Sequence, residues 1–382
     1  MSKGDLTRRG LVKATGGAAA IAASGLFIQG SRADSPKVSD LKVPLELGAL
    51  TEWDPLKEVI VGGWETKWPI LSKAELATIE ASVSEEGVKK FKEMQGTWME
   101  TDQPELFERV KKEAMDLKGT LENLGVKVYL PRKVIPEDID LYGKDTGFLP
   151  WFPRDMFVTH KNIVIFGSQG LPMLQKGQQI YYEIYDEKVT SSEHAEMIGT
   201  PFPNFTIKDG AKRNNNVPLV DGGDIMFFGD KVFFGVSEQQ VHGSNFRGAL
   251  WLQRVLGPEY EVITVPLKEK YFHLDLVLSA PREGLIIVAP EAFIDGVPPY
   301  FDDWDKIEVT GEQAMNGSVN GLPVNPENYI IGINERDDNK WLISQIKSRG
   351  IKVYPVWFNE HNLRDGSIRC ATQQLLRVPS DN

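Results

Sequence analysis

A recurring order of predicted strands and helices limits the fold of this chain more than any other feature of its sequence. Paired apolar segments joined by turn residues predict three hairpins, over Phe157–Phe166, Asp224–Val236 and His273–Ala289. Lys161 and Asn162 are the predicted turn of the first. Apolar residues at three- and four-residue steps predict four helices, over Leu71–Met94, Gln103–Leu124, Ser237–Leu256 and Asn339–Arg349. The order strand, strand, helix, strand repeats imperfectly, and about five copies would fill the chain. The pattern therefore predicts an α/β fold.

Length and composition set the limits on domains and partners. The chain has 382 residues, of which 41% are hydrophobic, and this length allows two or three domains. No low-complexity linker follows Glu52, so we expect residues 34–382 to form a single domain. Gly, Pro and Asn clusters at Val297–Pro299 and Asn316–Pro326 predict surface loops. The net charge of −11 argues against nucleic-acid binding, and the oligomeric state stays open, a homo-oligomer included.

Residues 1–33 have the features of an export signal. Arg8 and Arg9 precede an uncharged small and apolar run from Ala14 to Gln29, and Ser31-Arg32-Ala33 offers a cleavage site. The apolar run is too short and too rich in Gly and Ala to span a bilayer stably. The arginine pair resembles a twin-arginine signal, which implies export by the twin-arginine translocation machinery and a periplasmic location. The alternative is a basic N-terminus without a targeting function.

The single cysteine, Cys370, lies in the C-terminal stretch Asp365-Gly-Ser-Ile-Arg-Cys370-Ala-Thr-Gln-Gln374. A lone cysteine forms neither an internal disulfide nor a metal cage of several thiolates. It is therefore an inert buried thiol or a nucleophile. Gly366 and Ser367 before it and Thr372–Gln374 after it predict a tight loop rather than a packed apolar strand. A neighbouring arginine, Arg369, could help to hold a thiolate.

A polar cluster introduces each predicted hairpin. The three clusters are Trp151-Phe-Pro-Arg-Asp155, Asp221-Gly-Gly-Asp224 and His273-Leu-Asp275. Alternate residues of a strand share one face, so the third cluster predicts that His273 and Asp275 lie side by side. Each cluster also has a purely structural interpretation, as a local ion pair, a turn or a solvated strand edge. A site for Mn²⁺, Zn²⁺ or Ca²⁺ is the main chemical alternative, although the sequence has no HExxH helix.

Taken together, these motifs resemble the guanidino-group-modifying enzymes, a superfamily that includes arginine:glycine amidinotransferase, arginine deiminase, dimethylarginine hydrolase and agmatine deiminase. The motifs follow the family order, namely Glu52-Trp-Asp-Pro-Leu-Lys-Glu-Val-Ile-Val-Gly62, Pro153-Arg-Asp155, Asp221-Gly-Gly-Asp224, His273-Leu-Asp275 and Cys370. The opening motif is most similar to the amidinotransferase branch. The match runs from about Glu52 to Gln374. The resemblance implies a five-bladed, pseudo-symmetric α/β propeller of ββαβ units, the pentein fold, with the active site on its central axis.

The resemblance also implies a role for each motif residue. Cys370 is similar to the family nucleophile, whose thiolate attacks the guanidinium carbon and then carries the amidino group as a thiouronium. His273 resembles the general acid and base, and Asp221 the carboxylate that supports it. Asp155 and Asp275 resemble the carboxylates that hold the guanidinium nitrogens. The resemblance implies a small guanidino donor, an amine acceptor, and no metal or organic cofactor.

Two departures from the family pattern concern the substrate. Arg369 stands before Cys370, where family members usually carry a histidine. Amidinotransferases also carry an arginine downstream of the His-x-Asp motif that holds a substrate carboxylate, and Val288–Phe293 contains none. We assign Arg369 and Arg154 to the substrate side of the site, and Arg282 is another candidate for the carboxylate contact.

The sequence thus predicts an amidinotransferase-like enzyme that moves an amidino group from an arginine-like donor to an amine. The main alternative is a hydrolase or deiminase of the same superfamily that uses water, because attack by cysteine on the guanidinium is common to both. A second alternative is a binding protein for guanidino compounds that has lost turnover, which the altered context of Cys370 allows.

Overall fold

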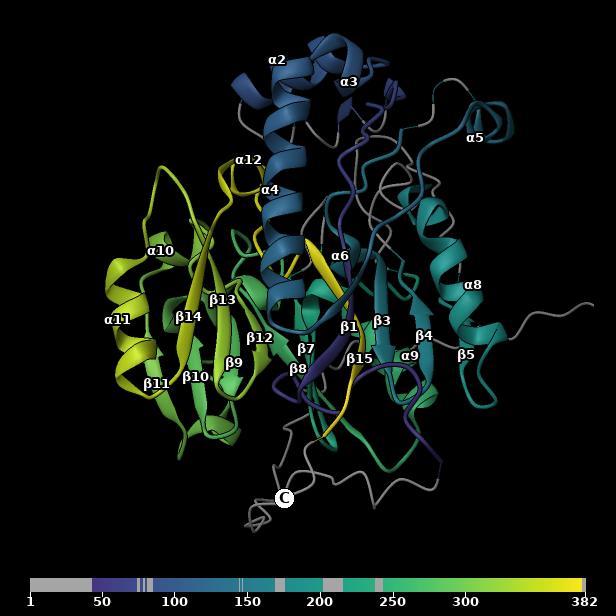
Figure 1. Ribbon diagram of the computed structural model, residues 1–382. Coiled ribbons are helices and arrows are strands. Elements are labelled where there is room, and N and C mark those ends of the chain that lie inside the picture. Colours follow the sequence, from purple (N-terminus) through teal and green to yellow (C-terminus); the bar gives the residue numbers. More distant parts are fainter. Residues whose placement is uncertain are drawn as a thin grey trace, which may run out of the picture. The chain divides into compact units, whose positions relative to one another are not determined.

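Each sheet in the described part of the chain has three strands, and its central strand pairs antiparallel with one neighbour and parallel with the other. The five sheets (Figure 1) contain β15 (Thr372–Arg377), β1 (Leu56–Val61) and β2 (Lys127–Tyr129); β3 (Phe157–His160), β4 (Ile163–Phe166) and β5 (Glu196–Gly199); β6 (Ile225–Phe228), β7 (Lys231–Val236) and β8 (Glu261–Pro266); β9 (Leu278–Arg282), β10 (Leu285–Val288) and β11 (Asp305–Glu308); and β12 (Leu322–Asn325), β13 (Asn328–Ile333) and β14 (Lys352–Trp357). The predicted α/β class and the repeated order are confirmed.

Helices supply most of the crossovers that the parallel strand pairs require. Between the central and third strands lie α4 (Pro104–Asn123), α8 (Tyr182–Thr190), α9 (Phe246–Leu256) and α11 (Lys340–Ser348). Only short 3₁₀ helices are described between β10 and β11, namely η5 (Pro290–Ala292) and η6 (Pro299–Phe301). The other helices are α2 (Glu85–Met94), α3 (Met99–Asp102), α5 (Pro136–Tyr142), α6 (Pro153–Met156), α10 (Gly311–Met315), α12 (Asn359–Asn362), η2 (Gly177–Tyr181), η3 (Gly222–Asp224) and η4 (Leu274–Leu276).

The structure is a computed structural model. It describes residues 43–379 except for 74–75, 78–79, 81–84, 144, 146, 169–175, 202–215 and 238–242. The predicted export signal over residues 1–33 lies outside the described residues. Among the helices that are described, none is both long enough and apolar enough to cross a membrane.

Helix α4 shows how the sequence pattern produces burial. Phe107, Val110, Ala114, Leu117 and Leu121 are buried along one face at alternating steps of three and four residues. The predicted periodicity is therefore confirmed, and the buried stripe begins at Phe107, whose neighbour Leu106 is half-buried. Gly125 follows the helix with φ +80°, a conformation that glycine adopts without strain and that ends helices.

The hairpin between β3 and β4 turns at the two residues that the sequence predicts. Lys161 and Asn162 both have positive φ, 43° and 65°, as the two-residue turn that matches strand twist requires. The Asn162 side-chain oxygen also accepts the backbone N–H groups of Glu46 and Leu47 at 2.7 and 3.0 Å. This turn therefore holds the segment that leads into β1.

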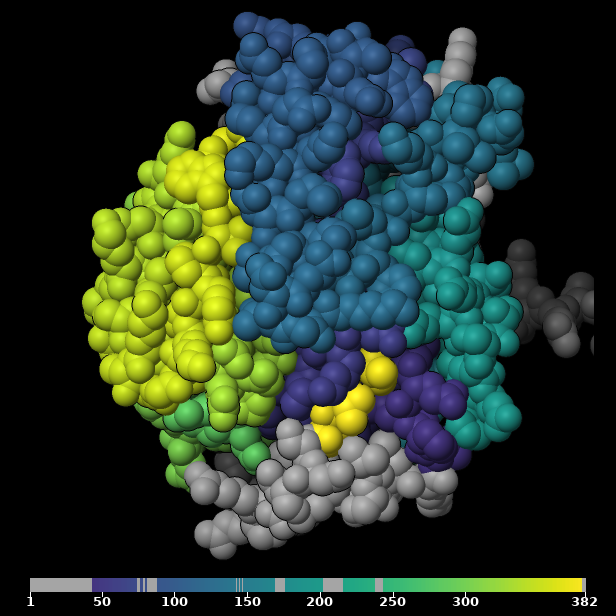
Figure 2. Space-filling model, in the orientation of Figure 1, coloured from purple at the N-terminus to yellow at the C-terminus, as the bar shows by residue number. Residues whose placement is uncertain are grey.

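The two ends of the domain meet in one sheet. Strand β15, next to the C-terminus, pairs antiparallel with β1, and Val59, Ile60 and Val61 lie opposite Gln374, Gln373 and Thr372. Figure 1 shows the yellow strand against the purple one, and Figure 2 shows yellow C-terminal atoms between purple N-terminal atoms. Strand β15 thus supplies the antiparallel neighbour of β1, and β2 supplies its parallel neighbour.

Two polar segments that the sequence places in loops are buried strands. Asn316–Pro326, predicted as a surface loop, contains β12, which pairs with β13. Thr372–Gln374 begins β15, whereas Cys370 itself lies in the turn before it. The polar side chains are buried because they find partners: Thr372 Oγ1 donates to the Ile368 carbonyl at 3.0 Å, and Gln373 Nε2 donates to Thr159 Oγ1 at 3.1 Å.

The helix predicted over Ser237–Leu256 is shorter in the structure. Helix α9 begins at Phe246, after Asn245, whose side-chain oxygen accepts the Gly248 N–H at 2.9 Å. An asparagine in this position favours a helix start because it satisfies a backbone donor that has no partner within the helix. Residues 238–242 of the prediction lie outside the described residues.

Candidate active site

Cys370 lies in the turn before β15 and is held from both sides. It is 2% exposed, and its carbonyl oxygen accepts the Arg154 backbone N–H at 3.3 Å. Helix α12, earlier in the same C-terminal segment, is fixed to α4 because the Glu113 carboxylate accepts the N–H groups of Glu360 and His361 at 2.8 and 3.2 Å. The pairing of β15 with β1 fixes the other side of the turn.

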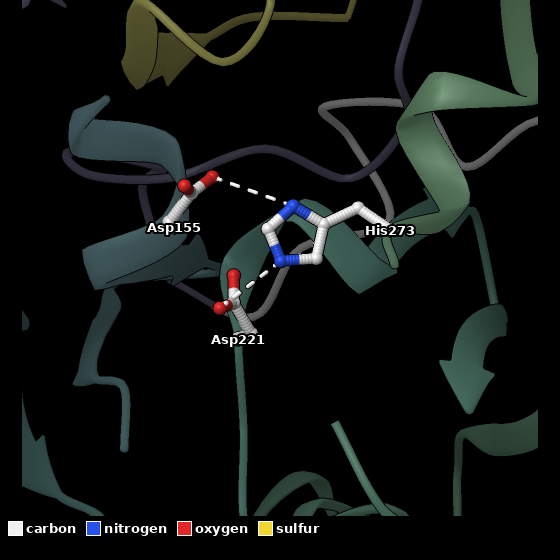
Figure 3. Close-up of side chains that lie close together, drawn as sticks. All are labelled: Asp155, Asp221 and His273. Atoms are coloured by element: carbon white, nitrogen blue, oxygen red, sulfur yellow. Dashed lines mark ion pairs between the residues drawn. The ribbon is translucent and has the colours of Figure 1, made fainter. Parts of the chain in front are cut away.

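His273 lies between two carboxylates, which approach its two ring nitrogens from different elements (Figure 3). Its Nε2 is 3.1 Å from Asp221 Oδ2, and its Nδ1 is 3.8 Å from Asp155 Oδ1. The side chains of His273 and Asp221 are 0% and 1% exposed, whereas that of Asp155, on α6, is 14% exposed. Asp221 is therefore placed to orient the ring, and Asp155 faces the more accessible side.

The prediction that His273-Leu-Asp275 forms a strand is wrong. Leu274–Leu276 forms η4, and β9 begins only at Leu278. The backbone turns here because the Leu274 N–H donates to Asp224 Oδ1 at 3.1 Å instead of to a neighbouring strand. The two side chains of the motif nevertheless belong to one site, since His273 faces Asp221 and Asp275 faces Cys370.

Asp275 lies between the thiol and Arg369. Both of its carboxylate oxygens are 3.8 Å from Cys370 Sγ, and the side chain is fully buried. Arg369 Nη1 donates to Oδ2 at 2.8 Å. The structure thus brings Asp275 to the predicted nucleophile, with Oδ2 engaged by an arginine.

The two arginines assigned to the substrate side are both buried. Arg369 is 1% exposed and donates to Glu52, Asp275 and the Ile225 carbonyl. Arg154 is 3% exposed, and its Nε lies 3.5 Å from the Arg369 carbonyl oxygen. Both guanidinium groups therefore lie in the protein interior, with that of Arg369 against Asp275, and this arrangement favours an indirect role in substrate binding.

Asn320 contacts the thiol, although no sequence pattern points to this residue. Its Nδ2 donates to Cys370 Sγ at 3.1 Å and to the Asp275 carbonyl oxygen at 3.2 Å, while its Oδ1 accepts the Cys370 N–H at 3.0 Å. The side chain is fully buried. Asn320 was missed because it lies in the segment predicted as a surface loop. The Asn-Gly pair there gave a turn signal and no signal of proximity to Cys370.

A further carboxylate, Asp224, accepts a hydrogen bond from the backbone next to His273. It accepts the Ser244 N–H at 2.5 Å and the Leu274 N–H at 3.1 Å, and Ser244 Oγ accepts the Asp221 N–H at 2.9 Å. Burial raises the pKa of Asp224 to about 7. These bonds join η3, η4 and the start of the α9 region around His273.

Charge in the site favours a bound cation. Burial alone lowers the pKa of His273, but the carboxylates of Asp221 and Asp155 outweigh it and raise the pKa well above its ordinary value. Burial raises the pKa of Asp155 well above its ordinary value, and Asp221 and Asp275 add to that rise. Burial and the Asp275 carboxylate raise the pKa of Cys370 to about 12. A cation beside these carboxylates would relieve their mutual repulsion.

The pKa of the thiol predicts a pH-dependent reactivity. Below a pKa of about 12 the thiolate fraction rises about tenfold per pH unit, so alkylation of Cys370 by iodoacetamide should be slow at neutral pH and accelerate steeply as the pH rises. Intact-protein mass spectrometry measures this rate directly, because the chain has one cysteine. A rate that stays constant between pH 7 and pH 9 would instead indicate a thiolate already paired with His273.

The same residues also form a candidate metal site. Ligand atoms of Asp155, Asp221 and His273 lie within 4.8 Å of one another. Oxygen and imidazole ligands suit Mn²⁺ or Zn²⁺, so the donor set agrees with the metal alternative. A substrate guanidinium bound to the same carboxylates would compete with a metal ion for this place. Treatment with a chelator distinguishes a metal site from a guanidinium site.

Gly223 packs against the His273 ring, so this position is sensitive to substitution. A Cβ atom there would lie 2.5 Å from His273 Nδ1 and 2.8 Å from Cγ. Gly223→Ala should therefore displace the ring and lower kcat/KM about a hundredfold. Gly119→Ala in α4 is the control, since nothing lies within 4 Å of its Cβ, and it should raise the free energy of unfolding by about 0.5–1 kcal/mol. Unchanged steady-state kinetics in Gly223→Ala would contradict this placement of His273.

The chain is similar to amidinotransferases along most of its length. No protein-family model matches it. It is 24% identical over 356 residues to inosamine-phosphate amidinotransferase 1 from Streptomyces glaucescens, covering 86% of this chain and 96% of that protein. It is 23% identical over 365 residues to L-arginine:L-lysine amidinotransferase from Pseudomonas savastanoi pv. phaseolicola, covering 86% and 93%.

The fold is also similar to that of a solved amidinotransferase. The structure of this enzyme, from the saxitoxin biosynthetic pathway of Microseira wollei, matches with a TM-score of 0.68 and 21% sequence identity, covering 88% of this chain and 98% of that chain. The sequence relatives and the fold agree with the motif residues that converge around Cys370. The chain is accordingly similar to amidinotransferases over most of its length, in sequence and in fold.

Proposed function

We propose that this enzyme transfers an amidino group from an arginine-like guanidino donor to an amine, through a covalent intermediate on Cys370. The observation that carries the proposal is the convergence on one buried position of a thiol, a histidine paired with a carboxylate, and two further carboxylates. A nucleophile, a general acid and base, and a clamp for a planar cation are the groups that this reaction needs.

Donor binding would place the guanidinium between Asp155 and Asp275. Planar N–H groups pair well with carboxylates, and such charge-assisted bonds fix the orientation of the reacting carbon. The bound cation would also change the nucleophile, because the negative charges of Asp275 and Asp155 are among the causes that raise the pKa of Cys370. The donor would thus help to generate the thiolate that attacks it.

The first half-reaction replaces a carbon–nitrogen bond by a carbon–sulfur bond. The Cys370 thiolate attacks the guanidinium carbon, and the bond to the substituted nitrogen breaks as His273 donates a proton to that nitrogen. The departing amine leaves an S-linked amidino-thiouronium. Asn320 Nδ2, 3.1 Å from Sγ, stabilises sulfur charge before attack and after release.

The second half-reaction reverses these roles. Neutral His273 removes a proton from the acceptor amine, which attacks the thiouronium carbon and expels the Cys370 thiolate. The positive charge of the imidazolium is balanced by Asp221, 3.1 Å from Nε2. One amidino group has then moved between two amines, and the enzyme has regained its starting charge.

L-Arginine is the donor that we would test first, because one relative is named an L-arginine:L-lysine amidinotransferase. Similarity to transferases over 86% of the chain favours an amine acceptor over water. The proposal also includes the finer inferences from the sequence. These are a pseudo-symmetric, five-bladed arrangement of the sheets, export by a twin-arginine signal over residues 1–33, and a periplasmic location.

The fate of the donor tests this proposal. The protein is mixed with L-arginine, quenched with acid and analysed by intact-protein mass spectrometry. Amidino transfer predicts an adduct of one amidino group and release of ornithine. A deiminase would instead leave a heavier adduct, because ammonia departs and the ornithine part stays attached.

A chase separates the remaining alternatives. Amines such as glycine or lysine should remove the adduct and yield new guanidino products, whereas buffer alone should leave most of it intact. Rapid loss in buffer, with release of urea, would indicate a hydrolase. Binding of L-arginine and other guanidino compounds with no adduct and no product would contradict the enzyme and support the binding protein. Treatment with EDTA should leave the adduct yield unchanged, and its loss would favour the metal site.

A further inference from the structure

We propose that Glu52 is a positioning residue of this enzyme, which acts through Arg369 to fix the carboxylate of Asp275 beside the nucleophile. The proposal rests on the proposed function, since it assigns Asp275 to the guanidinium site. Glu52 lies in a bend before β1, and its described hydrogen bonds go to Phe227 and Arg369 rather than to Cys370. Its role therefore follows from a chain of contacts between buried residues.

The Arg369 guanidinium bridges the two carboxylates. Its Nε and Nη2 donate to Glu52 Oε2 at 3.2 and 3.0 Å, and its Nη1 donates to Asp275 Oδ2 at 2.8 Å. All three side chains are at most 2% exposed. A planar guanidinium that is bonded on two edges cannot rotate without breaking one of these bonds. The orientation of Asp275 is thereby tied to the position of Glu52.

Glu52 is itself anchored independently of the bridge. Its Oε1 accepts the Phe227 N–H at 3.1 Å, and its own N–H donates to the Phe227 carbonyl at 3.0 Å. Arg369 Nη2 also donates to the Ile225 carbonyl at 3.0 Å. Strand β6 therefore provides a rigid base for both residues, as a precise binding site requires.

Charge explains why the arrangement needs Glu52. Three buried arginines, Arg369, Arg154 and Arg377, surround this carboxylate and hold its pKa below the ordinary value in spite of burial. Removing one partner of a buried ion pair leaves an uncompensated charge, which is far more disruptive than removing both. Without Glu52, Arg369 would keep only Asp275 as a charged partner. It would then pull the Asp275 carboxylate away from its position beside the Cys370 thiol.

The bridge also determines what Asp275 can offer a substrate. Arg369 takes one of the two acceptor sites of Oδ2, so Oδ1, 3.8 Å from Sγ, is the oxygen that keeps more of its capacity to accept a guanidinium N–H. A carboxylate that is partly engaged in this way depends strongly on its angle, and a misplacement of about 1 Å can reduce rates about a hundredfold. Glu52 therefore acts on catalysis without touching the substrate.

A double-mutant cycle tests this inference. The variants Glu52→Gln, Arg369→Gln and the double variant are compared with the wild-type protein, using L-arginine as donor. Each single variant should lower kcat/KM tenfold to a hundredfold, with kcat falling as well as the affinity for L-arginine. Because the two residues form one unit, the double variant should lie within about threefold of a single variant. If the loss of kcat/KM in the double variant equalled the product of the losses in the two single variants, the inference would be overturned.

Arg377→Lys is the matched control for a purely structural effect. Arg377 is also fully buried, but its guanidinium binds Gln374 Oε1 and the carbonyl oxygens of Asp54 and Pro323. This variant should lose stability while keeping kcat/KM within about threefold of wild type. If Glu52→Gln behaved in the same way, losing only stability, the positioning role would be wrong. If Glu52→Gln does not fold, Arg369→Lys replaces it in this test, because one ammonium group cannot bridge both carboxylates. Arg369→Lys should then show the same loss of kcat/KM.

Alkylation separates a failure of this inference from a failure of the proposed function. Absence of turnover by the wild-type protein would defeat the proposed function alone. Arg369→Gln leaves the charge of Asp275 uncompensated beside Sγ, so iodoacetamide should modify its Cys370 at least about threefold more slowly at pH 8. An unchanged rate would show that Arg369 does not control Asp275, whatever the substrate is.

Discussion

Replacing Cys370 with alanine should abolish the covalent adduct and lower kcat/KM for L-arginine by at least about 10⁴-fold. No other thiol exists in the chain, and no other nucleophile lies within the described site in a position to replace it. Loss of a nucleophile removes the covalent pathway altogether, so the remaining rate reflects binding and orientation only.

The same variant should still fold and still bind L-arginine. Removing one sulfur atom from a site that is 2% exposed costs about 1 kcal/mol, which a domain of this size tolerates. Calorimetry should therefore give a Kd for L-arginine within about threefold of the substrate affinity of the wild-type protein. Turnover by Cys370→Ala at more than one per cent of the wild-type rate would exclude Cys370 as the nucleophile.

Replacing His273 with asparagine should lower kcat about 10³-fold and slow both half-reactions. The departing amine would lack a proton donor, and the acceptor amine would lack a base. Rapid-quench mass spectrometry should show slow adduct formation, and adduct prepared at high enzyme concentration should react slowly with amines. Asparagine is small enough to fit in place of the histidine. The substitution leaves Asp155 and Asp221 without their cationic partner.

The pH profile provides the control for this variant. The carboxylates that raise the pKa of His273 act only while the imidazole is present, so the acidic and basic limbs that it contributes to the rate should disappear. A profile that keeps the wild-type shape at a reduced rate would assign the proton transfers to another group. Asp155→Asn should differ, because it should weaken donor binding and keep the histidine limb.

The sequence predicts those parts of the fold that depend on short-range pattern. Helix α4 follows from its periodicity, and the β3–β4 hairpin from two turn residues. Strand β12 was missed because its segment is rich in Gly, Pro and Asn, and its strand conformation depends on pairing with β13. Local composition carries no information about that partner.

The candidate site shows the same division. Motif order selects Cys370, His273, Asp221, Asp155 and Asp275, and the structure places each of them within 4 Å of another member of the set. Asn320 and the role of Glu52 are absent from the prediction, because each depends on a contact with the turn around Cys370 that spans a long stretch of chain. Similarly, Arg369 has a substrate-like guanidinium but lies buried between carboxylates of its own protein.

The pairing of β15 with β1 has a consequence for how the enzyme becomes active during synthesis. Cys370 and β15 follow all the other described strands in the chain, so a ribosome that stops before residue 370 releases a product without either. Contacts between residues so far apart form slowly, after the intervening segments have folded. We therefore expect the turn around Cys370 to be fixed only after β15 has been synthesised and has paired with β1.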